Sequence, residues 1–268
     1  MIKIRSPRYE QSEITLPQNV AQLNVAFNGE LCSSNGEIFQ IKKNILDLLK
    51  ENPSNLSPAE YSNFLSVTAS VYEDVWRTRS LGLITGNDFP IEREMQYLYD
   101  WVAPKPNELI VDLGCSTALY ARKLKEHQSA ADLIALDFSN PMLEEARKRA
   151  EADGAELYLI RADARKQPFF SEQVDAIVCG GTLNEFSEVR KVLYECKRVL
   201  KPDGRFFLMH LLEAETWWGK GLQLTAKGGG VSFHAKDEIN DLFKEAGFKL
   251  LKQHTEGIVC FSLLTTSA

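Results

Sequence analysis

Residues that can do chemistry recur at the ends of four apolar runs in the second half of the chain. Gly114 and Gly180 follow two of these runs, and Asp137 and Asp163 end the other two. Short apolar runs rich in branched side chains are typical of buried parallel strands. The carboxyl ends of such strands meet at one crevice, where open α/β sheets bind their ligands. We therefore expect these four residues at a single site.

The spacing within this set indicates what the site binds. Asp137 stands about 23 residues beyond Gly114, which is the position of a carboxylate that accepts hydrogen bonds from ribose hydroxyls. Leu119, Ala121 and Leu124 predict a helix after the glycine turn. The N-terminus of a helix attracts a phosphate or carboxylate group. The pattern predicts a nucleoside site with an anionic group at the turn.

The elements that must position this site alternate between strand and helix from about residue 106 onward, which indicates parallel βαβ units. We predict strands at 108–113, 132–137, 156–163, 173–181, 205–212, 248–254 and 257–264, and helices at 119–124, 139–154, 189–200 and 239–246. The helix at 139–154 has Ser139 or Asn140 as its cap, Pro141 in its first turn and Gly154 at its end.

The first third of the chain lacks this alternation. Residues 1–52 are predicted to form a small β-rich segment with a hairpin at Asn35-Gly36, and residues 53–105 to carry helices that cover the later sheet. Tyr72 and Trp76 on these lid helices are core residues or site residues. Trp217 and Trp218, in a glycine-rich insert, form a substrate-facing flap or exposed packing. The sequence leaves both choices open.

Composition limits the function classes. A chain of 268 residues with a net charge of −6 has no broad basic face, which disfavours a nucleic-acid substrate. Five cysteines, none in a CxxC pair, favour reduced thiols and a cytoplasmic location, with Cys115, Cys179 and Cys196 as small core residues. We expect neither secretion nor a membrane span, because no segment approaches eighteen apolar residues.

The glycine turn separates two cofactor classes. A dinucleotide fingerprint needs glycine at 114, 116 and 119, and only Gly114 matches. The pattern V-D-x-G-C-x-x-A at 111–118 instead resembles the first motif, D-x-G-x-G-x-G, of the class I S-adenosylmethionine-dependent methyltransferases. The segments at 133–147, 160–169, 174–186 and 195–208 resemble the later motifs of that family in the same order. Within the family, the chain is similar to the type 11 group, which includes the C-methyltransferases of ubiquinone and menaquinone biosynthesis.

This resemblance implies a Rossmann-like, seven-stranded α/β sheet over residues 106–268 with helices on both faces, and S-adenosylmethionine as cofactor. It places Asp137 on the ribose, Phe138 beside the adenine, Asp163 at the adenine amine and Ala164 at the ring edge. The complete set of implied cofactor-binding residues is Asp112, Gly114, Cys115, Ser116, Asp137, Phe138, Met142, Asp163, Ala164 and Gly180. The implied reaction is methyl transfer to a small-molecule acceptor that is hydrophobic or aromatic.

Two residues near the ends of the fourth and fifth strands are candidates for orienting the acceptor. These catalytic candidates are Asn184 and His210. The family often has histidine near position 184, and an asparagine there cannot act as a base. No metal-ligand cluster is evident in the sequence, so we expect no catalytic metal.

Residues 31–49 resemble a zinc-ribbon-like segment found in plastid and cyanobacterial members of the family. Asn35 stands where the second cysteine of that segment would be. Zinc needs about four ligands of the cysteine or histidine type, and Cys32 alone cannot supply them. We expect a ribbon remnant that keeps the shape without the metal.

Two other functions remain open at this point. Ser116 and Ala118 replace the second and third turn glycines, which is compatible with a catalytically silent cofactor-binding protein. A nicotinamide-dependent oxidoreductase is the enzyme alternative. The turn itself has two ways to accept Ser116: its backbone relaxes to negative φ, or the hydroxyl offsets the strain by donating to the cofactor's carboxylate.

Overall fold

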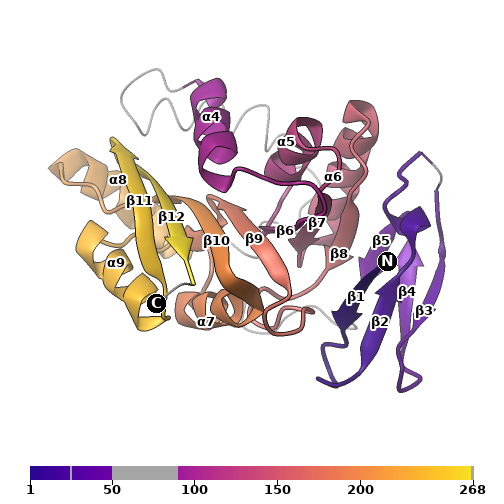
Figure 1. Ribbon diagram of the computed structural model, residues 1–268. Helices are drawn as coiled ribbons and strands as arrows, with labels where there is room; N and C mark the ends of the chain where they lie inside the picture. The colour runs from indigo at the N-terminus through magenta and orange to yellow at the C-terminus, as the bar shows by residue number, and fades with distance from the viewer. Residues whose placement is uncertain (25, 50–89, 267–268) are drawn as a thin grey trace.

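The computed structural model describes residues 1–24, 26–49 and 90–266, and one large sheet forms its centre (Figure 1). Seven strands of this sheet lie in the order β8-β7-β6-β9-β10-β12-β11. They are β6 (Leu109–Leu113), β7 (Asp132–Asp137), β8 (Tyr158–Arg161), β9 (Val174–Gly180), β10 (Leu200–Leu211), β11 (Lys249–Glu256) and β12 (Val259–Thr265). The first five pair in parallel, whereas β12 runs antiparallel to both β10 and β11. The Rossmann-like α/β fold predicted from the sequence is confirmed.

The order of these strands determines where a ligand site lies. From β6 the chain adds β7 and β8 on one side, then returns to add β9 and β10 on the other. An open sheet leaves a crevice at such a reversal, outside the carboxyl ends of the central strands. The predicted site is therefore expected at the carboxyl ends of β6, β7 and β9.

Three further strands extend the sheet, which has ten strands rather than the seven predicted. They are β3 (Gly29–Cys32), β4 (Ile38–Lys42) and β5 (Ile45–Asp47). The predicted hairpin joins β3 to β4, and β5 pairs in parallel with β8. Strands β1 (Ile2–Arg5) and β2 (Glu13–Leu16) form a separate two-stranded sheet beside them (Figure 1). The N-terminal strands thus continue the sheet on the side of β8.

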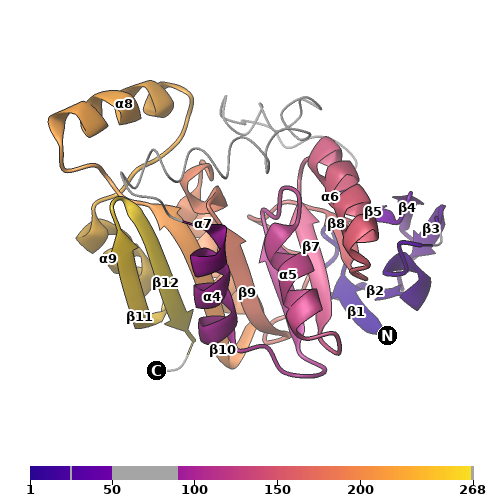
Figure 2. The same ribbon diagram turned by 90° about the horizontal axis from the view of Figure 1, so that it is seen from above.

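Helices cover both faces of the sheet, as Figure 2 shows. One face carries α4 (Ile91–Val102), α5 (Leu119–His127) and α6 (Asn140–Asp153), and the other carries α7 (Val189–Val199) and α9 (Lys236–Glu245). The predicted caps of α6 are present: the Ser139 hydroxyl accepts the Met142 N–H, and Gly154 ends the helix at φ +67°. Both features satisfy backbone groups that a helix end leaves without intrahelical partners.

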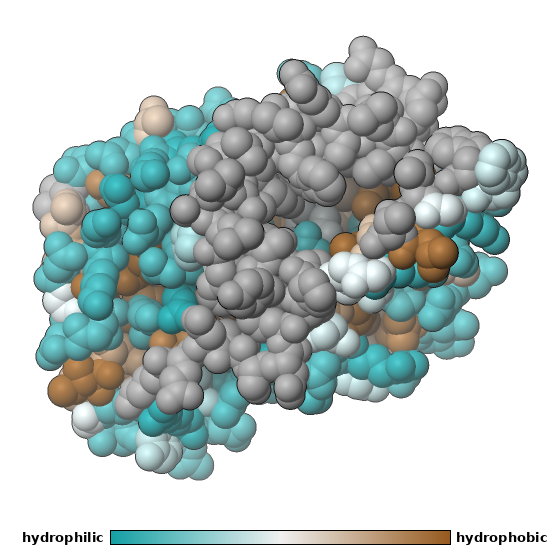
Figure 3. All heavy atoms as spheres, turned by 180° about the vertical axis from the view of Figure 1, so that it is seen from behind, coloured by the Kyte–Doolittle hydropathy of each residue, from teal (hydrophilic) through white to brown (hydrophobic). Residues whose placement is uncertain are grey.

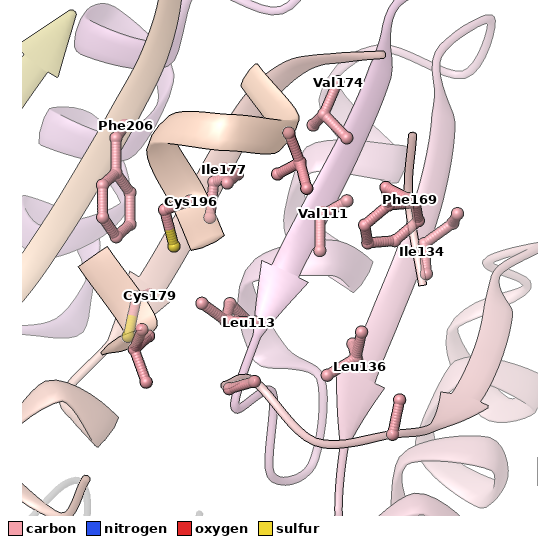
Figure 4. Packing of buried hydrophobic residues seen from close by; sticks show 14 of the residues in the cluster. Val111, Leu113, Ile134, Leu136, Phe169, Val174, Ile177, Cys179, Cys196 and Phe206 are labelled. Atoms are coloured by element: carbon pink, nitrogen blue, oxygen red, sulfur yellow. The ribbon is translucent and has the colours of Figure 1, made fainter. Parts of the chain in front are cut away.

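Alternation along β6 and β7 builds the two cores. Val111 and Leu113 of β6 face the α7 side together with Ile134 and Leu136 of β7, and Phe169 packs against them (Figure 4). Intervening residues such as Ile110 belong to the cluster on the α5 side. A strand that is buried on both faces reads as a continuous apolar run, which is why the sequence located these strands correctly.

The glycine-rich insert after β10 contains a helix that the sequence did not predict, α8 (Trp217–Gly228). Thr216 caps it by accepting the Gly219 N–H at 3.3 Å. The Trp217 side chain is 86% exposed. The part of the predicted lid helices that carries Tyr72 and Trp76 lies outside the described residues, as does the side chain of Trp218.

The surface of the described residues is mostly hydrophilic when the molecule is seen from behind, with hydrophobic side chains in small groups (Figure 3). None of the helices described here combines the length and apolar character needed to cross a membrane.

Candidate functional site

The turn between β6 and α5 keeps a glycine-like backbone although only one of its three expected glycines is present. Gly114, Ser116 and Ala118 have φ values of +62°, +51° and +58°. A residue with a Cβ pays about 1 kcal/mol for this left-handed conformation. The turn has therefore not relaxed to negative φ at Ser116, and that alternative is wrong. The chain keeps the backbone path of a glycine-rich turn at the cost of local strain.

Gly114 occupies a position that only glycine fits. A Cβ built on it would lie 2.6 Å from Cγ2 of Thr182, which is closer than non-bonded carbons approach. The Thr182 hydroxyl donates to the Gly114 carbonyl oxygen at 2.7 Å. This contact ties the end of β6 to the segment that follows β9. Sequence reasoning missed Thr182, although a polar residue directly after Gly180-Gly181 marks the end of a strand.

Asp137 ends β7 directly beside this turn. Its two carboxylate oxygens accept backbone N–H groups from both sides, Oδ2 from Ser116 at 2.9 Å and Oδ1 from Ser139 at 2.8 Å. Burial of the carboxylate raises the pKa of Asp137 from 3.8 to about 6, although these hydrogen bonds act in the opposite direction. The Phe138 N–H acts on the carboxylate in the same way. A carboxylate offers about four lone-pair sites, so three backbone donors leave it the capacity to accept a ligand hydroxyl.

Asp112 and Cys115 lie beneath the turn. Asp112 is 2% exposed, and its Oδ2 accepts the Ala121 N–H of α5 at 3.0 Å. Its carboxylate thus holds the start of α5 against β6, and a contact with the cofactor's amino-acid end stays a prediction. Cys115 is buried, and burial raises the pKa of its thiol well above the usual value. A neutral buried thiol behaves as a small apolar residue.

The segment after Asp137 carries Phe138, which is predicted to lie beside the adenine, and Met142, which is also predicted to bind the cofactor. Met142 is 1% exposed, and its sulfur accepts the Ser116 hydroxyl at 3.3 Å. The Phe138 carbonyl oxygen accepts Nε of Arg161 at 3.0 Å. These contacts join the glycine turn, the first turn of α6 and the end of β8. The structure therefore brings Ser116, Asp137 and Met142 together, and their binding of a cofactor stays a prediction.

Asp163 and Ala164 follow β8 on the same edge of the sheet. Ala164 is buried, and the Asp163 carboxylate is held by the Arg165 guanidinium at 2.8 to 3.1 Å. Arg165 also contacts Glu188 at 3.1 Å. The Arg165 backbone N–H also donates to Oδ1 of Asp163 at 2.8 Å, so the carboxylate is fixed in direction by a single residue. Its predicted contact with the adenine amine remains a prediction.

Gly180 is the last residue of β9, and Asn184 follows that strand. Gly180 ends β9 next to Met209 of β10. The Asn184 amide donates to the carbonyl oxygens of Leu211 and Ser232 at 2.8 and 2.6 Å and accepts the Leu211 N–H at 2.8 Å. Asn184 thus fastens the end of β10 to the chain segment before α9.

His210 lies inside the sheet at the end of β10. It is 2% exposed, its Nε2 is 3.2 Å from the Ser262 hydroxyl, and its ring meets Phe243 edge-on. Burial, with a smaller contribution from His234, lowers the pKa of His210 to about 3. The imidazole is therefore neutral at ordinary pH. His234 itself sits beside Leu212, just past β10, with its Nδ1 3.1 Å from Glu238.

The N-terminal segment replaces the second predicted ribbon ligand with a hydrogen-bonded turn. The Asn35 side-chain oxygen accepts the hydroxyls of Ser12 and Ser33 at 2.7 and 2.6 Å, and Cys32 is exposed. Within the described parts of the chain, no group of three or more histidine, cysteine or acidic side chains is placed to hold a metal ion. That the protein lacks zinc stays a prediction.

Comparisons with known proteins agree with this geometry. The family model of the methyltransferase domain matches residues 111–208. A demethylmenaquinone methyltransferase of Thermotoga maritima is 35% identical over 166 residues, which cover 53% of this chain and 71% of that protein. An uncharacterised chloroplastic methyltransferase of Arabidopsis thaliana is 26% identical over 190 residues, which cover 67% of this chain and 53% of the relative, so the chain spans about half the length of that protein.

Solved structures give the same fold. The phosphoethanolamine N-methyltransferase 2 of Haemonchus contortus, in complex with phosphomonomethylethanolamine and S-adenosylhomocysteine, superposes with a TM-score of 0.60. The match has 16% sequence identity and covers 74% of this chain and 46% of that one. At this identity the likeness concerns the fold alone.

Proposed function

Because the chain belongs to the class I S-adenosylmethionine-dependent methyltransferases, we propose that it binds S-adenosylmethionine at the β6 turn and transfers the methyl group to a small apolar acceptor. The observation that carries this proposal is the Asp137 carboxylate. Backbone N–H groups of Ser116 and Ser139 hold this carboxylate on both sides. It lies next to a turn in which every second residue, at 114, 116 and 118, has a positive φ. The fixed carboxylate oxygens are complementary to ribose hydroxyls. The nearby N-terminus of α5 is complementary to the carboxylate at the amino-acid end of the same ligand.

The residues present fit this cofactor. Asp137 would accept the ribose hydroxyls, and Phe138 and Ala164 would lie along the adenine. The backbone N–H groups at the start of α5 would bind the carboxylate of the methionine end. When bound, S-adenosylmethionine supplies a methyl group that is already electrophilic. The protein's task is to hold the acceptor in line with it at about 3 to 3.5 Å and to exclude water.

The retained positive φ values favour a turn that still binds the cofactor. Backbone amides at a turn bind an anion through their direction, and that direction depends on φ rather than on the side chain. Ser116 and Ala118 keep the left-handed conformation that glycines would adopt. The left-handed backbone is therefore kept although both residues carry a Cβ. The N–H groups of residues 115, 116 and 118 bond Leu136, Asp137 and Cys115, so the start of α5 would supply the N–H groups for an anion.

Neither of the two candidates for orienting the methyl acceptor, Asn184 and His210, is a strong base. An imidazole with a pKa of about 3, as in His210, takes up a proton poorly at neutral pH. Asn184 is engaged with main-chain groups on two segments. We propose that Asn184 and His210 shape the acceptor side by fixing the end of β10. The Thermotoga relative is named a demethylmenaquinone methyltransferase, so a quinol is the first acceptor class to assay.

Isothermal titration of the purified protein with S-adenosylhomocysteine and, separately, with NADH tests the cofactor class. We expect binding of S-adenosylhomocysteine and none of NADH. Asp137→Ala should weaken the binding by about 1.5 to 3 kcal/mol, the range for hydrogen bonds to a charged group. Asp132→Asn is the matched control, because Asp132 is an exposed carboxylate at the opposite end of the same strand. Tight binding of NADH, or no binding of either ligand, would contradict the proposal.

A further inference from the structure

Three residues from three different strands lie side by side at the edge of the cofactor site. Arg161 of β8 is in register with Asp137 of β7 on one side and with Asp47 of β5 on the other. Asp137 is the proposed ribose acceptor, whereas Asp47 belongs to the N-terminal strands. The extension of the sheet by β5 therefore reaches the level of the cofactor site.

The Arg161 side chain bridges the two neighbouring strands. Its Nε donates to the Phe138 carbonyl oxygen at 3.0 Å, and its Nη1 donates to Oδ2 and Oδ1 of Asp47 at 2.9 and 3.1 Å. The same Nη1 lies 3.3 Å from the Leu49 carbonyl oxygen. The backbone takes part as well, because the Leu48 N–H donates to the Arg161 carbonyl oxygen at 3.0 Å.

Burial and pairing fix the orientation of the Arg161 guanidinium. The Arg161 side chain is 9% exposed, and a buried guanidinium must be paired and hydrogen-bonded to remain stable. Asp47 supplies the negative charge, which holds the planar group in one orientation. In that orientation Nε points at the Phe138 carbonyl. The position of Phe138, between the Asp137 carboxylate and the Ser139 cap, thus depends on a carboxylate in the N-terminal segment.

We propose that Asp47, acting through Arg161, is a positioning residue for the adenosine half of the cofactor. The N-terminal strands then form part of the cofactor site: they hold the loop at 137–139 in the conformation that accepts ribose and adenine. This inference rests on the function proposed above and adds a role for the strands that extend the sheet. A purely structural ion pair would instead contribute to folding and leave the affinity of the folded protein unchanged.

Two variants separate these roles. Asp47→Asn removes the charge that orients the guanidinium. Arg161→Lys keeps a buried cation beside Asp47, but its single ammonium group does not reproduce the fork that reaches both Asp47 and Phe138. Glu13→Gln is the matched control, because it removes another N-terminal ion pair, Lys3–Glu13 at 2.8 Å, that lies away from the 137–139 loop.

The affinities for S-adenosylhomocysteine and for adenosine should be measured by isothermal titration, well below the unfolding temperature of each variant. We expect Asp47→Asn and Arg161→Lys to weaken both ligands by about tenfold, by the same factor for each, and Glu13→Gln to leave both unchanged. Asp47→Glu, which restores the charge, should recover most of the affinity. If Asp47→Asn does not fold, Arg161→Lys and Asp47→Glu still decide the question.

Wild-type affinities in folded Asp47→Asn and Arg161→Lys would overturn the positioning role. A loss of affinity in the Glu13→Gln control as large as in these two variants would overturn it as well. Failure of the wild-type protein to bind S-adenosylhomocysteine would instead refute the proposed function. The two failures are therefore distinguishable in one set of titrations.

Discussion

The raised pKa of Asp137 makes the affinity for S-adenosylhomocysteine depend on pH. The ribose hydroxyls donate to this carboxylate, so the ionised form binds the ligand better than the protonated form. With a pKa of about 6, the carboxyl group is almost fully ionised at about pH 7.5 and roughly one-tenth ionised at about pH 5. The dissociation constant should therefore rise about tenfold between these two pH values, which corresponds to about 1.4 kcal/mol.

The same pKa predicts an opposite effect on the stability of the unliganded protein. Because the folded pKa lies above the value of 3.8 for an unperturbed aspartate, ionisation costs stability. The cost is absent below about pH 4, develops between about pH 4 and pH 6, and is fully present above that range, where it amounts to about 3 kcal/mol. Asp137→Asn removes the charge, but its NH2 group would face one of the two backbone N–H donors that the carboxylate accepts. Any gain in the free energy of unfolding at about pH 7.5 should therefore stay below this amount, while ligand binding weakens.

Isothermal titration across the pH range, with urea unfolding at its two ends, measures both effects. Other groups can also change charge over this pH range, so the Asp137→Asn variant is the essential comparison. Asp137→Asn should bind S-adenosylhomocysteine weakly with little dependence on pH, whereas Asp132→Asn should keep the wild-type profile. A pH dependence that survives in Asp137→Asn would show that another group is responsible and would refute the reasoning.

Three other predictions follow from single positions. Ser116→Gly should relieve the strain of φ +51° and stabilise the protein by about 1 kcal/mol, while the affinity for S-adenosylhomocysteine changes by less than about tenfold; restoration of tight binding to an otherwise inactive protein would favour the silent-protein alternative. His210, with its pKa lowered to about 3, stabilises the fold above about pH 6.5 and loses that contribution as the pH falls toward 3, so His210→Phe should lower the acid midpoint followed by circular dichroism; an unchanged midpoint would contradict this. Elemental analysis should find no stoichiometric zinc, because the ribbon-like segment offers Cys32 with Asn35 in place of a second cysteine; about one zinc per chain would show that expectation to be wrong.

The sequence predicted the seven strands and the helices between them because each carries its own local signal. The continuous apolar runs of β6 and β7 reveal strands buried on both faces, and the Ser139 cap and Gly154 mark the ends of α6. The convergence of Gly114 and Asp137 followed from the topology of parallel sheets alone. These features are encoded within about twenty residues and need no information on distant contacts.

Long-range features were not accessible in the same way. The pairing of β5 with β8 joins residues more than a hundred positions apart, and the three-residue strand Ile45–Asp47 has no pattern that names its partner. Helix α8 was missed because its three glycines, at 219, 221 and 228, lower helix propensity. The Thr216 cap and the hydrogen bonds of the Gln223 side chain to the backbone of Leu212 and Ala214 support the helix instead. Thr182 was missed because its role depends on a contact with Gly114 across the crevice.

The glycine turn shows most clearly why a motif and its function can separate. By residue type, only Gly114 of positions 114, 116 and 118 has the glycine of the family pattern. By backbone conformation, all three residues lie in the left-handed region that glycine favours, because their φ values are +62°, +51° and +58°. Ser116 gains a hydroxyl that bonds Met142, and its N–H bonds Asp137, so contacts around the turn support a conformation that its own side chain disfavours. A binding turn is defined by where its N–H groups point, and neighbouring hydrogen bonds can hold that direction when the glycines that usually permit it are absent.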